Sequence, residues 1–169
     1  MSLKIFITGK PKVGKSTLIK ELVEELKDKF KIAGFFTPEI LKNGKRIGFK
    51  VVDVFGKREG TLASEKITKT KFGKYFIDLE SFESFLDGIE KEVEYAEIVV
   101  IDEIGRMELF SKKFVKFLKK VLESDKILIA TLHRKLKKNF SKYGIIFELT
   151  RENKAKLKQE ILEYLEYKI

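Results

Sequence analysis

The sequence predicts an α/β fold, in which a mostly parallel sheet carries helices on both faces and contains one antiparallel hairpin as an insertion. Short apolar runs alternate along the 169 residues with segments whose apolar residues recur at helical spacing, as expected of strand and helix units in a parallel sheet. Residues 98–101 are four consecutive β-branched apolar residues, which is typical of a strand buried on both faces. Asn43 and Gly44 separate two further apolar runs and indicate a two-residue turn with positive φ at both positions.

The elements follow in a regular order from the N-terminus. We expect a first strand at 4–8, then a helix from Lys15, because the apolar residues from Leu18 to Phe30 recur at helical spacing. Further strands are expected at 32–36, 75–77, 98–101, 127–130 and 145–149, with the hairpin strands at 38–41 and 47–52. Apolar spacing predicts further helices at 82–93, 114–122 and 157–165. No linker, repeat or low-complexity stretch interrupts this order, so we expect residues 1–169 to form one domain.

Composition excludes several classes of function. The chain has no Cys, which excludes a disulfide framework, a zinc ribbon and a thiol nucleophile and favours a reducing compartment. No apolar run approaches the roughly 18 residues that a membrane span requires. The N-terminus also lacks the pattern of a secretory signal peptide. We therefore expect a cytoplasmic protein that does not bind membranes, and we expect it to be a monomer.

The net charge of +10 raises the question of a nucleic-acid partner. Lysine supplies 31 of the 36 basic residues and arginine only five, and the lysines alternate with glutamates at 21–29 and 154–166. Such alternation is typical of solvated helix faces with ion pairs along the helix. Nucleic acid is therefore a partner that we keep open but do not favour. Abundant Lys and Glu with one Gln and three Asn favour a thermophilic protein as the explanation for the charge.

A phosphate-binding loop follows the first strand. Its pattern is G-x-x-x-x-G-K-S/T, formed by Gly9, Lys10, Pro11, Lys12, Val13, Gly14, Lys15 and Ser16. The glycines let the backbone curl so that successive N–H groups face phosphate oxygens, the lysine reaches the β- and γ-phosphates, and the serine hydroxyl binds Mg²⁺. The helix that starts near Lys15 adds the positive end of its dipole to the same anion site.

An acidic pair follows the buried strand at 98–101. A phosphate loop requires a second carboxylate to hold Mg²⁺, and Asp102 lies at the carboxyl end of a buried strand where such a group is expected. Glu103 is then placed to orient an attacking water or to take its proton. The sequence therefore predicts Lys15, Asp102 and Glu103 as catalytic residues, with Ser16 and Asp102 as the metal ligands.

Four residues are candidates for contact with the γ-phosphate. Thr131 and His133 follow the strand at 127–130 and could sense this phosphate, whereas Arg106 and Arg134 could neutralise charge in the transition state. For His133, the only histidine, a structural hydrogen bond is the alternative role. For Arg106 the alternative is a surface ion pair.

Several blocks in order resemble a known family, the small thermophilic nucleoside-triphosphatases related to the cancer-related nucleoside-triphosphatase. The blocks are the phosphate loop and residues 34–40, 46–49, 62–63, 102–109 and 130–134, of which D-E-I-G-x-M-E-L at 102–109 is the most specific. The resemblance implies a RecA-like P-loop sheet and Mg²⁺-dependent hydrolysis of ATP, GTP and other nucleoside triphosphates to diphosphate and phosphate. It also implies nucleotide contacts from the loop through Thr17 and from a second segment that comprises Ile98, Val99, Val100, Ile101, Asp102, Glu103, Ile104 and Gly105.

Two positions depart from the family pattern. Lys12 stands where a glycine is common in the loop, and Arg106 replaces the usual lysine after D-E-I-G. Lys12 must therefore tolerate the backbone geometry of the loop, and it adds a positive charge close to the phosphates. If this charge stabilises the bound substrate and the transition state equally, it would tighten nucleotide binding without raising kcat.

Three other functions use the same loop. A small-molecule kinase requires an arginine-bearing lid, for which residues 134–138 are the only candidate. A regulatory GTPase is suggested by D-x-x-G at 102–105, but the segment that resembles its guanine-reading motif, Asn153 to Lys156, ends in lysine, which cannot accept the guanine N–H groups. An RNA-associated nucleotide-binding module is the third alternative, and the few arginines count against it.

Overall fold

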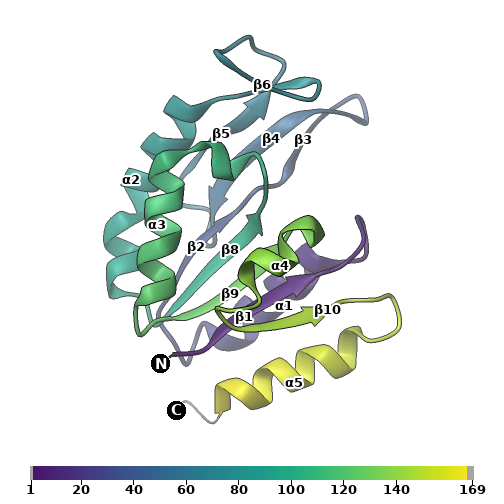
Figure 1. Ribbon diagram of the computed structural model, residues 1–169, viewed down its shortest axis with the longest axis vertical. Coiled ribbons are helices and arrows are strands. Elements are labelled where there is room, and N and C mark those ends of the chain that lie inside the picture. Colours follow the sequence, from purple (N-terminus) through teal and green to yellow (C-terminus); the bar gives the residue numbers. More distant parts are fainter. Residues whose placement is uncertain (1, 167–169) are drawn as a thin grey trace.

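The computed structural model describes residues 2–166 and places ten strands in one sheet with helices on both faces (Figure 1). The strands are β1 (Lys4–Thr8), β2 (Ile32–Phe36), β3 (Glu39–Lys42), β4 (Lys45–Asp53), β5 (Glu59–Ser64), β6 (Thr70–Phe72), β7 (Tyr75–Ile77), β8 (Ile98–Ile104), β9 (Ile127–Leu132) and β10 (Ile145–Glu148). The helices are α1 (Lys15–Leu26), α2 (Leu79–Tyr95), α3 (Lys112–Glu123), α4 (Lys137–Phe140) and α5 (Lys154–Glu166), with 3-10 turns η1 (Glu108–Phe110) and η2 (Arg134–Leu136). The ends of the domain predicted at 1–169 lie outside the described residues.

The parallel half of the sheet has the strand order β10-β1-β9-β8-β2, with all neighbours parallel. Ile7 of β1 pairs with Thr131 of β9, and Phe36 of β2 pairs with Asp102 of β8. The carboxyl ends of these strands therefore meet at one edge of the sheet, which is where ligands bind in open parallel sheets. The predicted α/β class with a parallel core is confirmed.

The antiparallel half continues from β2 through β4, β5, β7 and β6, with β3 paired to β4. The predicted turn joins β3 to β4, and both Asn43 and Gly44 have positive φ, at 53° and 75°. The sequence analysis missed β5 and β6, because Glu59–Ser64 carries no clear alternation and Thr70–Phe72 is only three residues long. Backbone pairing with β4 and β7 forms these strands, so the inserted part is larger than one hairpin.

The helices cover the two faces of the sheet in separate groups. Phe82, Phe85 and Phe114 of α2 and α3 bury their rings against one face, together with Phe35 of β2. The helices α1 and α5 cover the other face through apolar residues such as Leu22 and Ile161. Burial of two such layers is the main favourable free-energy term for a domain of this size.

Close packing of the strands explains one glycine in the block at 34–40. Gly34 of β2 has φ of 138°, and a Cβ at this position would lie 1.8 Å from the carbonyl oxygen of Val100 in β8. No other residue type fits at this distance, so Gly34 allows β2 to approach the strand that carries Asp102 and Glu103.

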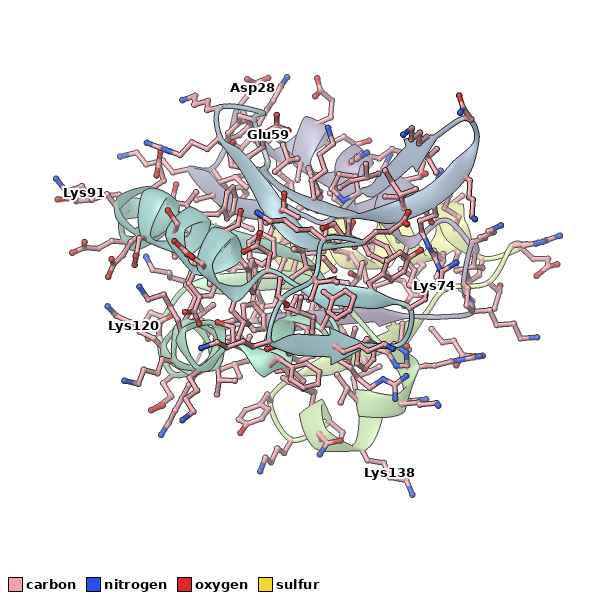
Figure 2. The ribbon with its side chains drawn as sticks, turned by 90° about the horizontal axis from the view of Figure 1, so that it is seen from above. Asp28, Glu59, Lys74, Lys91, Lys120 and Lys138 are labelled. Carbon is pink, nitrogen blue, oxygen red and sulfur yellow. The ribbon has the colours of Figure 1, made fainter. Side chains whose placement is uncertain are left out.

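Charged side chains project outward on several sides of the molecule. Lys74, Lys91, Lys120 and Lys138 come from four separate segments and point in different directions (Figure 2). The glutamates of α1 pair mainly with α5 rather than along their own helix, since Glu21 binds Lys154 and Lys158, and Glu25 binds Lys158. The alternating charges thus connect two neighbouring helices, in addition to a local pair of Glu24 with Lys27 of the kind that the sequence suggested.

No helix among residues 2–166 has the length and apolar character that crossing a membrane requires.

Candidate active site

The phosphate loop joins the end of β1 at Thr8 to the start of α1 at Lys15. Gly14 caps the helix with φ of 107°, a conformation that a residue with a side chain rarely adopts. Gly9 passes close to the last strand, where a Cβ would lie 2.7 Å from the carbonyl oxygen of Leu149. Both glycines that the motif fixes therefore have a structural reason, and the loop curls at the positive end of the α1 dipole.

Lys15 folds back over this loop. Its Nζ donates hydrogen bonds to the carbonyl oxygens of Gly9, at 2.9 Å, and Lys10, at 3.3 Å. Ser16 and Thr17 are exposed in the first turn of α1. The ammonium group therefore lies against the loop, next to the first turn of the helix, which is where the motif places it for phosphate binding.

Lys12 occupies the left-handed region with φ of 63°. This conformation strains a residue that has a Cβ, and it is the backbone geometry that the sequence analysis expected Lys12 to tolerate. The side chain is exposed.

Asp102 lies near the end of β8, where the pairing with β9 shifts register between Ile101 and Ile104 and the Asp102–Glu103 peptide is cis. β8 continues through Ile104, three residues beyond the predicted end of this strand. The Asp102 side chain is 7% exposed, and its Oδ1 accepts a hydrogen bond of 2.6 Å from the Thr131 hydroxyl. The Thr37 hydroxyl donates to the Asp102 carbonyl oxygen at 2.9 Å. Thr131 of β9 thus holds this carboxylate, and Thr37 after β2 holds the backbone of the same residue.

Glu103 is half-buried next to Asp102. Burial is the main cause that raises the pKa of Glu103 to about 6, and the Asp102 charge adds to it, while the charge of Lys15 acts in the opposite direction. The structure therefore brings the predicted catalytic residues Lys15, Asp102 and Glu103 into one electrostatic environment. A carboxyl group with a pKa close to neutral is suited to proton transfer.

The four predicted γ-phosphate residues have different surroundings. Thr131 is fully buried and its hydroxyl binds Asp102, so we expect it to orient that carboxylate rather than to contact phosphate. His133 accepts a hydrogen bond from the backbone N–H of Lys135 through Nδ1, at 3.2 Å, and caps η2. Burial, followed by the charges of Arg106 and three other basic residues, lowers the pKa of His133.

The two arginines are exposed. The Arg106 guanidinium carbon lies 5.3 Å from the centre of the Phe72 ring, which is a cation–π contact with the short strand β6. Arg134 is exposed on η2 and lines a cavity with Gly9 and Lys10 of the phosphate loop. Arg134 is therefore the arginine of this pair that directly borders the phosphate loop.

This cavity of about 500 Å³ lies between the phosphate loop and the segment that joins β10 to α5. Its lining includes Arg134, Glu148, Thr150, Arg151 and Glu152. Asn153 fixes the joining segment, because its Oδ1 accepts from Thr150 N at 2.8 Å and its Nδ2 donates to Glu148 O at 2.9 Å. The amide of Asn153 is thus engaged within its own loop, where a guanine-reading asparagine would have to face the base.

Sequence reasoning missed two groups near the site. Thr37 lies in the block at 34–40, yet nothing in the sequence showed that its hydroxyl reaches the backbone of Asp102. Glu108, in the block at 102–109, is 2% exposed, and burial raises the pKa of this carboxyl well above its ordinary value. A glutamate surrounded by Met and Leu was the signal that could have identified Glu108 as a buried acid.

The fold and the phosphate loop define a P-loop nucleotide-binding protein of the α/β class. The chain belongs to the NTPase family, whose model matches residues 4–162. A nucleoside-triphosphatase THEP1 from Methanocaldococcus jannaschii is 42% identical over 162 residues, which cover 95% of this chain and 95% of that protein. The nucleoside-triphosphatase THEP1 of Archaeoglobus fulgidus is 36% identical over 173 residues, with coverage of 97% and 99%.

Two solved structures share the fold. The crystal structure of THEP1 from the hyperthermophile Aquifex aeolicus matches with a TM-score of 0.83 and 32% identity, over 97% of this chain and 99% of that one. The solution structure of a human cancer-related nucleoside triphosphatase matches with a TM-score of 0.77 and 28% identity, over 97% of each chain. The resemblance inferred from the sequence blocks is therefore confirmed.

Proposed function

We propose that this protein hydrolyses nucleoside triphosphates to nucleoside diphosphate and phosphate in the presence of Mg²⁺. The observation that carries the proposal is the meeting of the phosphate loop with the Asp102–Glu103 pair at one sheet edge, close enough for the charge of Lys15 to influence the pKa of Glu103. The relatives named nucleoside-triphosphatase support the same activity.

The loop supplies the binding site for the triphosphate. Backbone N–H groups at 9–16 and the Lys15 ammonium neutralise the phosphate charge, while Ser16 and Thr17 lie at the start of α1 beside it. The cavity next to the loop accommodates the nucleoside, since it is continuous with Gly9 and Lys10. Of the second segment, Asp102 and Glu103 carry the polar side chains at the carboxyl end of β8, so we infer that its nucleotide contacts centre on these two residues.

The residues present fit Mg²⁺. This ion prefers a few hard oxygen ligands and takes others from water and substrate phosphates, and Ser16 and Asp102 supply a hydroxyl and a carboxylate. Thr131 binds only Oδ1 of Asp102, which leaves Oδ2 for the metal or its water. When bound, Mg²⁺ would neutralise charge that develops on the β- and γ-phosphate oxygens.

Glu103 positions the attacking water in this scheme. The water oxygen forms the new bond to the γ-phosphorus, the bond from that phosphorus to the β–γ bridging oxygen breaks, and the carboxylate of Glu103 takes the proton of the water. Lys15 and the loop amides stabilise the charge that moves to the leaving diphosphate. Thr131 and Thr37 keep Asp102 in the direction that the metal requires.

The structure disfavours two of the alternatives. A kinase lid would have to come from residues 134–138, but these form η2 and the start of α4, which Phe140 anchors against Phe6 with ring centres 5.5 Å apart. A guanine-specific GTPase would require a free asparagine amide, whereas that of Asn153 is engaged in its own loop. Hydrolysis with little preference for the base is the activity that this geometry supports best.

Phosphate release from ATP, GTP, CTP and UTP tests the proposal, with Mg²⁺ and with excess EDTA. We expect release that depends on Mg²⁺ and falls by roughly 10²- to 10⁴-fold in Glu103→Gln, while nucleotide binding is retained. Lys15→Ala should weaken binding and turnover together. An unchanged rate in Glu103→Gln would remove this residue from the reaction, and phosphate transfer to an added acceptor in place of water would favour the kinase.

We further infer that the protein acts as a monomeric, single-domain enzyme in the cytoplasm and does not require nucleic acid. Size-exclusion chromatography with light scattering would test whether the protein is a monomer. A steep rise in phosphate release on addition of RNA would contradict the inference that the enzyme does not require nucleic acid.

A further inference from the structure

Nearly all of the net charge lies in one segment of the chain. Residues 110–147 contain eleven basic and two acidic residues, whereas the remaining positions contain 25 basic and 24 acidic residues. A thermophilic composition explains the balanced part, in which lysine and glutamate alternate. It does not explain a segment with a net charge of +9, and such a local excess is typical of a surface that binds a polyanion.

The fold gathers this segment on one face of the sheet. The segment comprises α3, β9, η2 and α4. Phe114 of α3 and Phe140 of α4 belong to the same apolar cluster, so both helices cover the same face (Figure 1). Ten of the eleven basic side chains are exposed, while Lys126 is half-buried and donates to the carbonyl oxygens of Glu94 and Ala96. The helices α3 and α4 and the turn η2 thus form one basic surface.

Acidic side chains leave this basic surface largely uncovered. Lys113 pairs with Asp87 of α2. Within the described part of the chain, residues 2–166, none of the other nine exposed basic side chains forms an ion pair. The neighbouring helix α2 carries six acidic residues and one lysine, and it therefore borders the surface on one side. A polyanion is attracted to α3 and α4 and repelled by α2.

The apolar side chains of the segment distinguish between two kinds of polyanion. A helix that binds a membrane inserts its apolar face into the lipid, but that of α3 is buried through Phe114, Leu118 and Val121. Two rings of the segment are accessible, since Phe110 is 47% exposed and Tyr143 is 41% exposed. Such rings stack on the bases of a single strand, whereas a duplex keeps its base faces inside. A single-stranded nucleic acid therefore fits this surface better than a membrane or a duplex.

We propose that the basic surface of α3, η2 and α4 binds single-stranded nucleic acid through its phosphate backbone, with bases stacked on Phe110 and Tyr143. Lysine supplies ten of the eleven basic residues, and it binds phosphate as a point charge rather than through the planar fork that reads base edges. We therefore expect little sequence preference and a strong dependence on salt. This inference does not rest on the proposed function, because α3 and α4 contain none of the residues proposed for catalysis.

Fluorescence anisotropy of the full chain with a labelled oligouridylate of about 12 nucleotides tests the proposal. We expect a Kd of about 10⁻⁴ to 10⁻⁶ M at physiological salt, with a slope of about −3 for log affinity against log KCl concentration, as for about four neutralised phosphates. A variant with four charge reversals on α3 and near α4 should bind at least about 30-fold more weakly, because it loses these contacts and repels the strand. The reversals are Lys116→Glu, Lys119→Glu, Lys138→Glu and Lys142→Glu.

A matched control separates the local surface from the net charge of the protein. It reverses four lysines that are exposed elsewhere, by Lys29→Glu, Lys66→Glu, Lys69→Glu and Lys156→Glu. Both variants have the same net charge, and we expect the control to bind within about fivefold of the unmodified protein. Equal weakening in the two variants would overturn the proposal, as would an unmodified protein that does not bind the oligouridylate.

Two further ligands test the kind of polyanion. A duplex of the same length bound as tightly as the single strand would overturn the proposal. Sedimentation with vesicles of phosphatidylserine and phosphatidylcholine, without binding to the oligouridylate, would also overturn it. Circular dichroism and Mg²⁺-dependent phosphate release show that the variants fold, and glutamine replaces glutamate at the four positions if the reversed protein does not. Absence of phosphate release from the unmodified protein would contradict the proposed function alone.

Discussion

Among single residues, Thr131 shows how a buried hydroxyl contributes to the site through Asp102, without contacting phosphate itself. Its Oγ1 donates to Oδ1 of Asp102 at 2.6 Å, and the side chain is fully buried. Thr131→Val keeps the shape and removes this bond, so we expect a 10- to 100-fold loss in Mg²⁺ affinity or in kcat/KM. Mg²⁺ titrations of phosphate release measure the effect, and Thr131→Ser, which retains the hydroxyl, is the control. Equal Mg²⁺ dependence in all three proteins would contradict this role.

Glu108 also makes stability depend on pH. Because its folded pKa lies above that of the unfolded chain, the folded state binds more protons from pH about 4.5 upward, and the free energy of unfolding falls as pH rises toward the folded pKa. Glu108→Gln lacks this titration, so the difference between the Tm of the variant and that of the unmodified protein should grow with pH over this range. Thermal unfolding followed by circular dichroism from pH 4 to 8 measures the difference. A constant difference would mean that Glu108 ionises as easily as in the unfolded chain.

The sequence identified single residues best where a motif fixes both residue type and spacing. The positions of the phosphate loop after β1 and of the Asp102–Glu103 pair near the end of β8 could be predicted because each follows a short apolar run, whereas their roles stay predictions. Thr131 was predicted near the site, but its partner depends on the register of β8 against β9, which no local pattern encodes. Glu108 was missed for the same reason, since only the reversal after Gly105 shows that it is buried near the end of β8.

Among the elements, the pairing of β2 with β8 depends on one glycine. A Cβ on Gly34 would lie 1.8 Å from Val100 O, whereas a Cβ on Gly44, in the hairpin turn, meets no atom within 4 Å. Both residues have positive φ, so Gly44→Ala reports the backbone strain alone, about 1–2 kcal/mol. Gly34→Ala should destabilise by more than about 3 kcal/mol, because the strands must separate. Urea unfolding gives the free energy of unfolding of both variants. Equal losses of this free energy would show that β2 accommodates the added Cβ without further destabilisation.

Elements with strong apolar runs or helical spacing were predicted close to their observed bounds. β5 and β6 were not, because β5 has no clear alternation, β6 is only three residues long, and each forms by pairing with a strand that also has another partner. The ion pairs between α1 and α5 were also beyond local reasoning. The hairpin of β3 and β4 extends the sheet from β2.

At the scale of the whole molecule, the arrangement of the two halves determines how strongly the base is recognised. The cavity that we propose for the nucleoside is bordered by the phosphate loop and by the segment after β10, while the antiparallel strands lie at the opposite end of the sheet. The side chains available to a base there are long and exposed, such as Arg134 and Arg151, and these can stack on any base.

We therefore expect kcat/KM for ATP, GTP, CTP and UTP to differ by less than about 100-fold. A buried polar site built for one base would reject others by about 10⁴-fold or more, but Asn153, the amide best placed for such a role, is already bonded to Thr150 and Glu148. Initial rates with each nucleotide at saturating Mg²⁺ measure the four values, and inorganic tripolyphosphate shows how much affinity the nucleoside adds. A single nucleotide preferred by more than about 10³-fold would mean that the loop after β10 rearranges on binding and frees the Asn153 amide.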